Sequence, residues 1–295
     1  MCRKSVDFWV ELPSPLKNSF KAAFFDFAKR VYDEKGLVLS SYFPVQMGGD
    51  MKDEDYLLNM EHSRIPKNYF CMGFGEISDT RFFEKNIRSG LFSYKKIVGW
   101  FPEAIVVDKK RLGNRPVPKN YFDLEKTCYK NEICIIGTPE IPDPLVSLFI
   151  YRKRGENSMR HFIENLAGFG APVNAIRHIG KSSNKFGSIF IMPLLFANVC
   201  REIKDTEILV SDTGIFAEPF VLLSQNIEDE KSRLILEFLN SEELKHVFTE
   251  KDFLISDYES DKLIDPLCKD FCFLELEKVY KDLRKNFSKK NGEVQ

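Results

Sequence analysis

The sequence contains few of the residues, and none of the motifs, that usually mark an enzyme or a metalloprotein. Its four histidines, His62, His161, His178 and His246, do not have metal-ligand spacing. There is no CxxC pair, and no G-x-S-x-G, G-x-x-x-x-G-K-[ST] or H-E-x-x-H motif is present. We therefore predict a protein that is not an enzyme, with no catalytic residue, no metal site and no cofactor.

An excess of charge of either sign is also missing. The chain has 43 Lys and Arg residues against 44 Asp and Glu residues, for a formal net charge of -1. A balanced chain produces no overall basic field to attract nucleic acid or an anionic membrane. No stretch of about 18 apolar residues is present, so we expect no helix that spans a membrane.

The N-terminus shows no apolar signal-peptide stretch after Met1. Seven cysteines leave at least one thiol unpaired, and most of them lie in apolar runs, as reduced cysteines do in cytosolic proteins. From these two features we expect a cytoplasmic protein. If a leader peptide has been removed, the alternative is an extracellular or periplasmic protein in which Cys2 resembles the first residue of a mature lipoprotein.

What the sequence does contain is a regular alternation of short strands and helices. Residues 6–12 read as a buried strand, Ser14 as an N-cap, residues 15–35 as an amphipathic helix that ends at Gly36, and residues 37–45 as a second strand. Further short strands are expected near 69–74, 104–107, 133–136 and 188–192, and helices near 158–168 and 262–286. A chain of 295 residues exceeds one typical core, so we predict two α/β lobes with mainly parallel central sheets.

Three of the predicted strands end in a Gly/Pro/Ser loop that starts a helix, near residues 12–15, 74–79 and 137–144. Ligands of open α/β sheets bind outside the carboxyl ends of the strands, and free N–H groups at helix starts favour an anion. Each loop taken alone is equally typical of an ordinary turn with a capping residue. Their shared position in one fold favours a binding cleft.

Four segments of the second half carry a recognisable order of features: VPKNYFDL (117–124), GSIFIMP (187–193), SDTGIFAEPF (211–220) and EKSRLILEFLNSEE (230–243). They resemble motifs of the type 2 periplasmic binding protein family, and the nearest branch is the iron(III)-type substrate-binding proteins of ABC transporters. The order of features covers most of residues 97–250.

This resemblance implies two lobes joined by a two-strand hinge, residues 1–104 with 217–262 and residues 105–216 with 263–295. A small solute would lie between the lobes, which would close on it by hinge motion. The resemblance also implies a monomer, with an ABC permease as partner if the protein is exported.

One segment departs from the iron(III) branch, whose members usually carry adjacent tyrosines after the strand matched to residues 188–192. This chain has Met192, Pro193, Leu194 and Leu195 there, and none of these side chains offers oxygen to a ferric ion. We therefore expect an oxyanion or a carboxylate as the solute, with an apolar or aromatic solute as the alternative.

The predicted ligand-binding residues come from strand ends and loops, each of which could instead be a turn former, a cap or a core residue. Two alternative functions stay open: an enzyme acting on a small anionic metabolite on the same scaffold, and a ligand-free interaction module. The predicted residues are Pro13, Ser14, Gly48, Gly49, Gly75, Glu76, Trp100, Thr138, Glu140, Ser182, Ser183 and Asn184.

Overall fold

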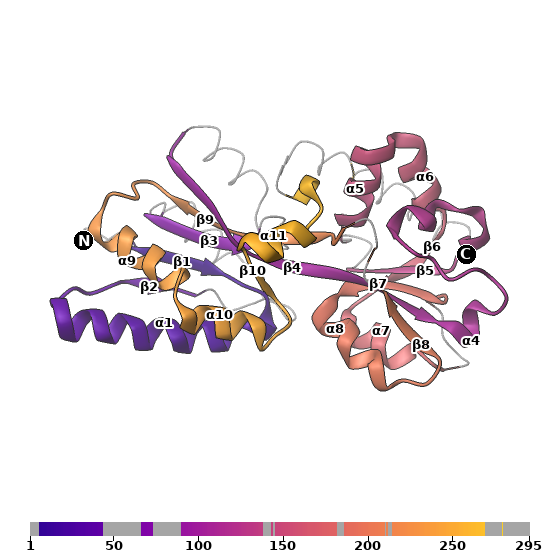
Figure 1. The fold of residues 1–295 in the computed structure, drawn as a ribbon, viewed down its shortest axis with the longest axis horizontal. Helices are drawn as coiled ribbons and strands as arrows, with labels where there is room; N and C mark the ends of the chain where they lie inside the picture. Colours follow the sequence, from indigo (N-terminus) through magenta and orange to yellow (C-terminus); the bar gives the residue numbers. More distant parts are fainter. Residues whose placement is uncertain are drawn as a thin grey trace, which may run out of the picture. The chain divides into compact units, whose positions relative to one another are not determined.

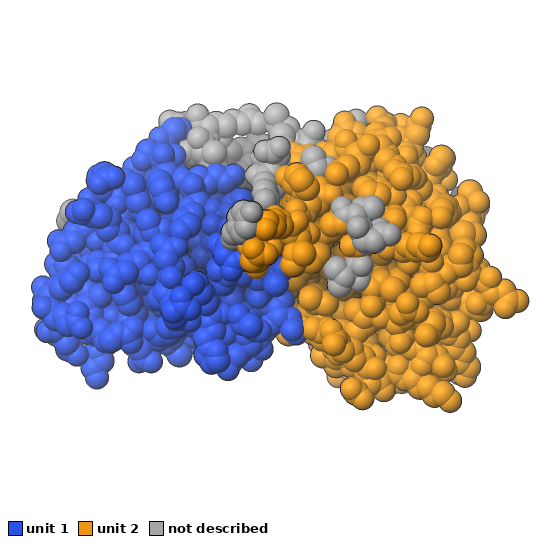
Figure 2. Space-filling view, in the orientation of Figure 1, with its two compact units in different colours: residues 1–100, 219–257 blue, residues 101–218, 258–295 orange. Residues whose placement is uncertain are grey.

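The chain forms two compact units, each built from two separate segments (Figure 2). Unit 1 consists of Met1–Trp100 and Pro219–Asp257, and unit 2 of Phe101–Glu218 and Tyr258–Gln295. The chain therefore passes between the units at 100/101, 218/219 and 257/258, where the sequence-based boundaries lay at 104/105, 216/217 and 262/263. The computed structural model describes residues 6–43, 66–72, 90–137, 143, 145–181, 186–209, 211, 214–268 and 279.

The sheet of unit 1 combines parallel and antiparallel strands. Strand β1 is parallel to β2 and to β3, and β9 runs antiparallel to β3. Strand β4 follows β9 in the sheet order and pairs with β10 in antiparallel fashion. The elements of unit 1 are β1 (Phe8–Glu11), α1 (Ser14–Lys35), β2 (Ser41–Tyr42), β3 (Asn68–Met72), part of β4 (Tyr94–Asp108), most of β9 (Ala217–Ser224), α9 (Glu230–Leu239), α10 (Glu242–Thr249) and β10 (Leu254–Ile255).

Helix α1 forms because apolar residues recur on one side of it. Its buried residues are Leu16, Phe20, Ala23, Phe24, Phe27 and Val31, and it ends at Gly36, whose φ of 66° suits a residue without Cβ. The helix packs on β1 through phenylalanines: the ring of Phe24 lies 5.1 Å from that of Phe8. Helix α10 lies beside α1 (Figure 1), and Arg30 of α1 forms a 2.8 Å ion pair with Glu243 of α10.

Unit 2 places a mixed sheet between two groups of helices. Strand β7 is parallel to β5 and antiparallel to β4, β5 is parallel to β6, and β8 runs antiparallel to β4. The elements are α4 (Lys109–Leu112), η1 (Tyr121–Glu125), η2 (Thr127–Tyr129), β5 (Ile133–Ile136), α5 (Leu145–Arg154), α6 (Glu156–Glu164), β6 (Leu166–Gly170), α7 (Pro172–His178), β7 (Ile189–Pro193), α8 (Leu194–Val199), η3 (Cys200–Glu202), β8 (Thr206–Leu209), α11 (Tyr258–Leu263) and η4 (Pro266–Cys268).

The two faces of this sheet have different cores. On one face, Phe190 and Met192 of β7 pack with Ala175 of α7 and Ala197 of α8. Elsewhere in the unit Phe216 stacks between Tyr121 and Phe149, with ring centroids 4.3 and 4.2 Å away. Phenylalanine side chains therefore form part of the core in both units.

The α/β fold class is confirmed, with four differences in detail. The N-cap of α1 is Pro13, and Ser14 is the first helical residue. The strand expected at 104–107 is the end of the longer β4, and the helix expected at 158–168 ends at Glu164, before strand β6. The helix expected at 262–286 is not continuous at its start: α11 ends at Leu263, Ile264 and Asp265 are not helical, and Pro266 lacks the N–H group that a helix interior needs. The rest of that range, from residue 269, lies outside the described residues apart from Val279.

Candidate functional site

Three of the twelve predicted ligand-binding residues lie within the described residues. Pro13 and Ser14 form the turn between the carboxyl end of β1 and α1, where the Pro13 carbonyl accepts hydrogen bonds from the N–H groups of Leu16 and Lys17 at 3.0 and 3.1 Å. The Ser14 side chain is exposed, as a solute contact requires. The residues outside the described ranges are Gly48, Gly49, Gly75, Glu76, Thr138, Glu140, Ser182, Ser183 and Asn184.

Trp100 does not have the exposure that was expected of it. Its side chain is 0% exposed in β4, where it lies opposite Leu254 of β10. Beside it, a Cβ added to Gly99 would lie 2.6 Å from the Leu254 carbonyl oxygen, so the two strands approach closely here. In this structure the indole has no surface to offer a solute, and its position favours core packing over stacking on a ligand.

The carboxyl end of β1 holds a buried carboxylate that sequence reasoning missed. Glu11 is 7% exposed; its Oε1 accepts from the Trp9 indole N–H at 3.0 Å and its Oε2 from the Tyr69 hydroxyl at 2.5 Å. The signal available in the sequence was one glutamate at the end of the otherwise apolar run Phe8–Val10. These contacts fix the orientation of Glu11 next to the Pro13–Ser14 turn.

The carboxyl ends of β5 and β7 in unit 2 hold a second group of acidic residues. Glu103 of β4 is 4% exposed and lies opposite Pro193, the last residue of β7. Asp143 follows β5: its N–H donates to the Ile136 carbonyl at 2.9 Å, and its Oδ1 accepts from the Leu145 N–H at 2.8 Å, at the start of α5. Both carboxylates lie at the edge of the sheet where ligands of this fold class bind.

Tyr121 connects these acidic residues. Its hydroxyl donates to the Glu103 carbonyl at 2.8 Å, and its side chain is fully buried. Burial raises the pKa of the Tyr121 hydroxyl well above its ordinary value, and the nearby carboxyl groups of Glu103 and Asp143 raise it further. The phenol is therefore neutral, and it serves as a hydrogen-bond donor within an acidic environment.

Asp265 adds a third carboxylate to this group in unit 2, and it has a cation partner. Its side chain is 1% exposed, and its Oδ2 lies 3.1 Å from Nζ of Lys153 in α5. Close by, Cys268 Sγ accepts from the Ala217 N–H at 3.4 Å, and burial raises the pKa of this thiol to about 12. Glu103, Asp143 and Asp265 together, with Lys153 alongside, define what we call the acidic edge of unit 2. Such an edge disfavours an unaccompanied anion.

Metal ligands are not clustered in the described part of the chain. Within those residues, no group of three or more His, Cys, Asp or Glu side chains could hold a metal ion. Helix α8 starts with Leu194 and Leu195, whose side chains carry no oxygen. Any ion bound here would need oxygen atoms from another source.

A two-unit α/β fold with polar groups at the carboxyl ends of its strands is typical of solute-binding proteins. Residues 69–266, about two thirds of the chain, match the family described as bacterial extracellular solute-binding protein, and the chain belongs to that family. No curated protein matches the sequence. The predicted family is thereby confirmed.

Several solved structures share the fold. A Trichodesmium protein in complex with iron and citrate matches with 13% identity and a TM-score of 0.63, over 97% of this chain and 99% of that one. A Bordetella ferric binding protein matches with 12% identity and a TM-score of 0.61, over 97% and 98%. A spermidine/putrescine-binding protein from Streptococcus pneumoniae matches with 10% identity and a TM-score of 0.52, over 95% and 92%. These identities show a common fold.

The family corrects the predicted compartment. Its members are described as extracellular, so the expectation of a cytoplasmic protein was wrong. That expectation rested partly on cysteines: Cys71, Cys134, Cys200 and Cys268 are free and buried, and Cys128 is free and exposed. A small apolar thiol is buried because it packs well, whatever the compartment. Among the described helices, none is long and apolar enough to cross a membrane.

Proposed function

We propose that this chain is the substrate-binding component of an ABC importer, and that its solute is ferric iron bound together with a small carboxylate or oxyanion. The observation that carries the solute-binding role is the family match over residues 69–266. Members of such a family deliver a solute to a permease and do not transform it. An ABC permease is accordingly the proposed partner.

The choice of solute rests on two features of unit 2 that point in different directions. The acidic edge of Glu103, Asp143 and Asp265 opposes a bare anion and favours a cation. The segment after β7 offers Leu194 and Leu195, which cannot ligate a hard ferric ion. A ferric ion that arrives with its own carboxylate ligands satisfies both conditions, and the Trichodesmium protein of similar fold was solved with iron and citrate.

The solute is proposed to bind at the carboxyl ends of the strands, where ligands of open α/β sheets bind. Pro13 and Ser14 after β1, and the nine predicted residues outside the described ranges, stay candidate contacts. Hinge motion of two units joined by β4 and β9 is the proposed means of capture. Residues of the acidic edge would then balance the charge of the ferric ion.

The test compares four additions to the purified full-length protein: ferric citrate, ferric nitrilotriacetate, gallium citrate and citrate alone. The measurement is the melting temperature, because a ligand that binds only the native state adds about 2.7 kcal/mol at a concentration of 100 Kd. We expect ferric citrate and gallium citrate to raise it, and citrate alone to leave it unchanged.

Each other result would select a different function. A full shift with citrate alone would favour an oxyanion or carboxylate solute, as the sequence first indicated. A shift with ferric nitrilotriacetate equal to that with ferric citrate would show that the protein ligates iron without a specific anion. Chemical change of the added compound would favour an enzyme. No shift with any solute of a wider panel would favour a ligand-free interaction module.

A further inference from the structure

Unit 1 is built from two segments that are distant in the sequence and pack against each other. Strands β1, β2 and β3 and helix α1 come from the first segment, whereas most of β9 and helices α9 and α10 come from residues 219–257. The docked surfaces share a phenylalanine core in which Phe238 of α9 lies 5.3 Å from both Phe20 and Phe24 of α1. Apolar packing of this kind attracts the segments but is not directional.

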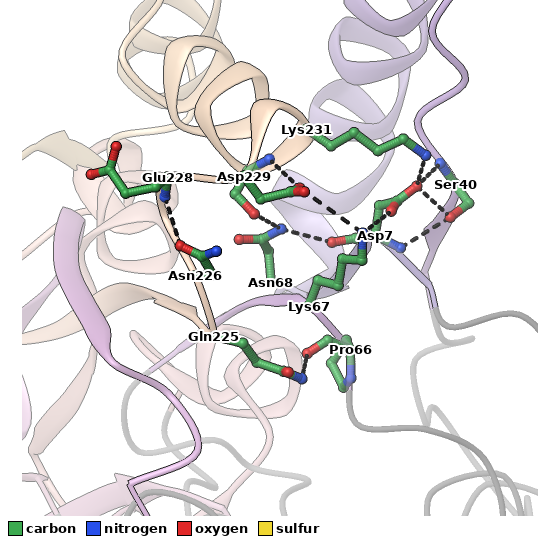
Figure 3. A network of polar contacts seen from close by, with 11 residues as sticks. Asp7, Ser40, Pro66, Lys67, Asn68, Gln225, Asn226, Glu228, Asp229 and Lys231 are labelled. Carbon is green, nitrogen blue, oxygen red and sulfur yellow. Dashed lines mark hydrogen bonds and ion pairs between the residues drawn. The ribbon is translucent and has the colours of Figure 1, made fainter.

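A directional contact lies at the amino end of β1, where the carboxylate of Asp7 is 3% exposed. Its Oδ2 accepts from the Ser40 N–H at 3.0 Å, from the Ser40 hydroxyl at 2.8 Å and from Nζ of Lys231 at 2.8 Å. Nζ of Lys67 lies 3.6 Å from Oδ1. One buried carboxylate thus contacts the residue before β2, the residue before β3 and the first turn of α9 (Figure 3).

Neighbouring polar contacts also join the two segments. The side-chain amide of Asn68 donates to the Asp7 carbonyl at 2.9 Å and to the Ser232 hydroxyl of α9 at 3.0 Å. Nζ of Lys67 lies 3.9 Å from Asp229, the N-cap of α9. Gln225 donates to the Lys67 carbonyl through its N–H at 2.9 Å and to the Pro66 carbonyl through its side chain at 2.9 Å (Figure 3).

We propose that these residues form a clasp, centred on Asp7, that fixes the returning segment 219–257 on the first segment and so controls local opening of unit 1. The residues of the clasp are Asp7, Ser40, Lys67, Asn68, Gln225, Asp229, Lys231 and Ser232. The clasp lies at the amino ends of the parallel strands, away from the edge where the solute is proposed to bind.

The charges of the clasp are matched in a way that makes it sensitive to single substitutions. Lys67, the residue before β3, and Lys231 of α9 face Asp7, and Asp229 is the second carboxylate at the start of α9. Burial alone would raise the pKa of Asp7, but hydrogen bonds from Lys231 and Ser40 outweigh it, so the pKa is lowered. Asp7 is therefore an anion in the folded protein, and removing Lys231 leaves a buried anion with one more distant cation.

The test is amide hydrogen exchange of the full chain, followed peptide by peptide, for wild type, Asp7→Asn, Lys231→Met and the double variant. Exchange reports local opening within a folded protein. For Lys231→Met we expect exchange at least about tenfold faster in β3, the end of β9 and α9, and unchanged exchange in β5 and β7 of unit 2. The double variant should behave like Asp7→Asn alone, because the two residues act as one unit. The matched control is Arg233→Met, an exposed cation two residues further along α9, which should leave exchange unchanged.

Unchanged exchange in both single variants would overturn the proposal. Equal acceleration in both units would overturn it as well, since the clasp would then contribute only to global stability. Additive effects in the double variant would show that Asp7 and Lys231 are not coupled. If Asp7→Asn does not accumulate as folded protein, the milder Lys67→Met tests the same prediction, with a smaller acceleration expected in the same peptides. None of these outcomes depends on the solute.

Discussion

In both units a buried aspartate of one segment contacts a lysine of the other segment, but the two aspartates lie at opposite ends of their sheets. In unit 1, Asp7 meets Lys231 at the amino ends of the parallel strands. In unit 2, Asp265 meets Lys153 beside the residues at the carboxyl ends of β5 and β7. The difference indicates that the Asp7–Lys231 pair serves the assembly of unit 1, whereas the Asp265–Lys153 pair also contributes to the potential where a solute is proposed to bind.

The largest expected effect tests the close packing of unit 2 at Gly187, two residues before strand β7. Gly187 has a φ of +85°, and a Cβ there would lie 2.3 Å from the Glu132 carbonyl oxygen. We expect Gly187→Ala to lower the free energy of unfolding by about 3 kcal/mol or more, from backbone strain and overlap together. Denaturant unfolding measures this.

Gly155 is the matched control for that substitution. Its φ is +83°, nearly the same, but no atom lies within 4 Å of the added Cβ. Gly155→Ala should therefore cost only the backbone strain of its φ of 83° and ψ of -176°, about 1–3 kcal/mol. Equal losses of unfolding free energy in the two variants would mean that overlap of the added Cβ with Glu132 does not contribute to the loss in Gly187→Ala.

The next effect addresses the ion pair of unit 2. Asp265→Asn keeps the shape of the side chain but removes the charge that faces Lys153. Because the aspartate is 1% exposed and the lysine 38% exposed, we expect a loss of about 2 kcal/mol, below that of a fully buried pair. The free energy of unfolding from chemical denaturation is the measurement. The exposed pair of Glu259 and Lys262 supplies the control: Glu259→Gln should change stability by less than about 0.5 kcal/mol.

A smaller effect concerns the pH dependence of stability that Asp7 of unit 1 contributes. The pKa of Asp7 is lowered in the folded state, so its contribution to stability is complete above its ordinary value of 3.8 and is lost as the pH falls through the folded value. We expect the melting temperature of wild type to drop more steeply than that of Asp7→Asn between pH 5 and pH 3. Parallel curves for the two proteins would contradict the assigned charge of Asp7.

The smallest effect concerns thiols and should not alter stability. Among the described cysteines, Cys128 is exposed, whereas Cys71 of unit 1 and Cys134, Cys200 and Cys268 of unit 2 are buried. Burial also raises the pKa of Cys134 to about 12 and that of Cys200 to about 11, which keeps both protonated. Peptide mapping after brief alkylation of the native protein should find Cys128 modified well before the other four. Fast labelling of Cys134 would contradict the burial of its thiol in the core of unit 2.

Local sequence patterns predicted some helices and strands correctly and missed others. Helix α1 was predictable because its apolar residues recur every three or four positions and Gly36 marks its end. Strand β6 was not, since Gly168 and Gly170 dilute its β-propensity, and β4 was shortened because Lys95 and Pro102 interrupt its apolar run. These errors come from reading a strand by its side chains when pairing with neighbouring strands determines it.

The site was harder to predict than the fold because its contacts are distant in sequence. The turn of Pro13 and Ser14 was found because a strand, a proline and a helix start follow one another. The contact of Glu11 with Tyr69 spans 58 positions, and that of Asp7 with Lys231 spans 224. No local spacing encodes such pairs. The compartment was predicted wrongly for a related reason. Burial of a thiol depends on its neighbours in the fold, so it does not identify the compartment.

The split of unit 1 into two segments also has a consequence during synthesis. Residues 101–218 must leave the ribosome before Pro219–Asp257 can join the first segment. At roughly 5–20 residues per second, that interval lasts from several seconds to about 20 seconds. Throughout it, the faces of Phe20 and Phe24 that later pack on Phe238 have no partner from their own chain. The newborn first segment is therefore the part of this protein most in need of a chaperone.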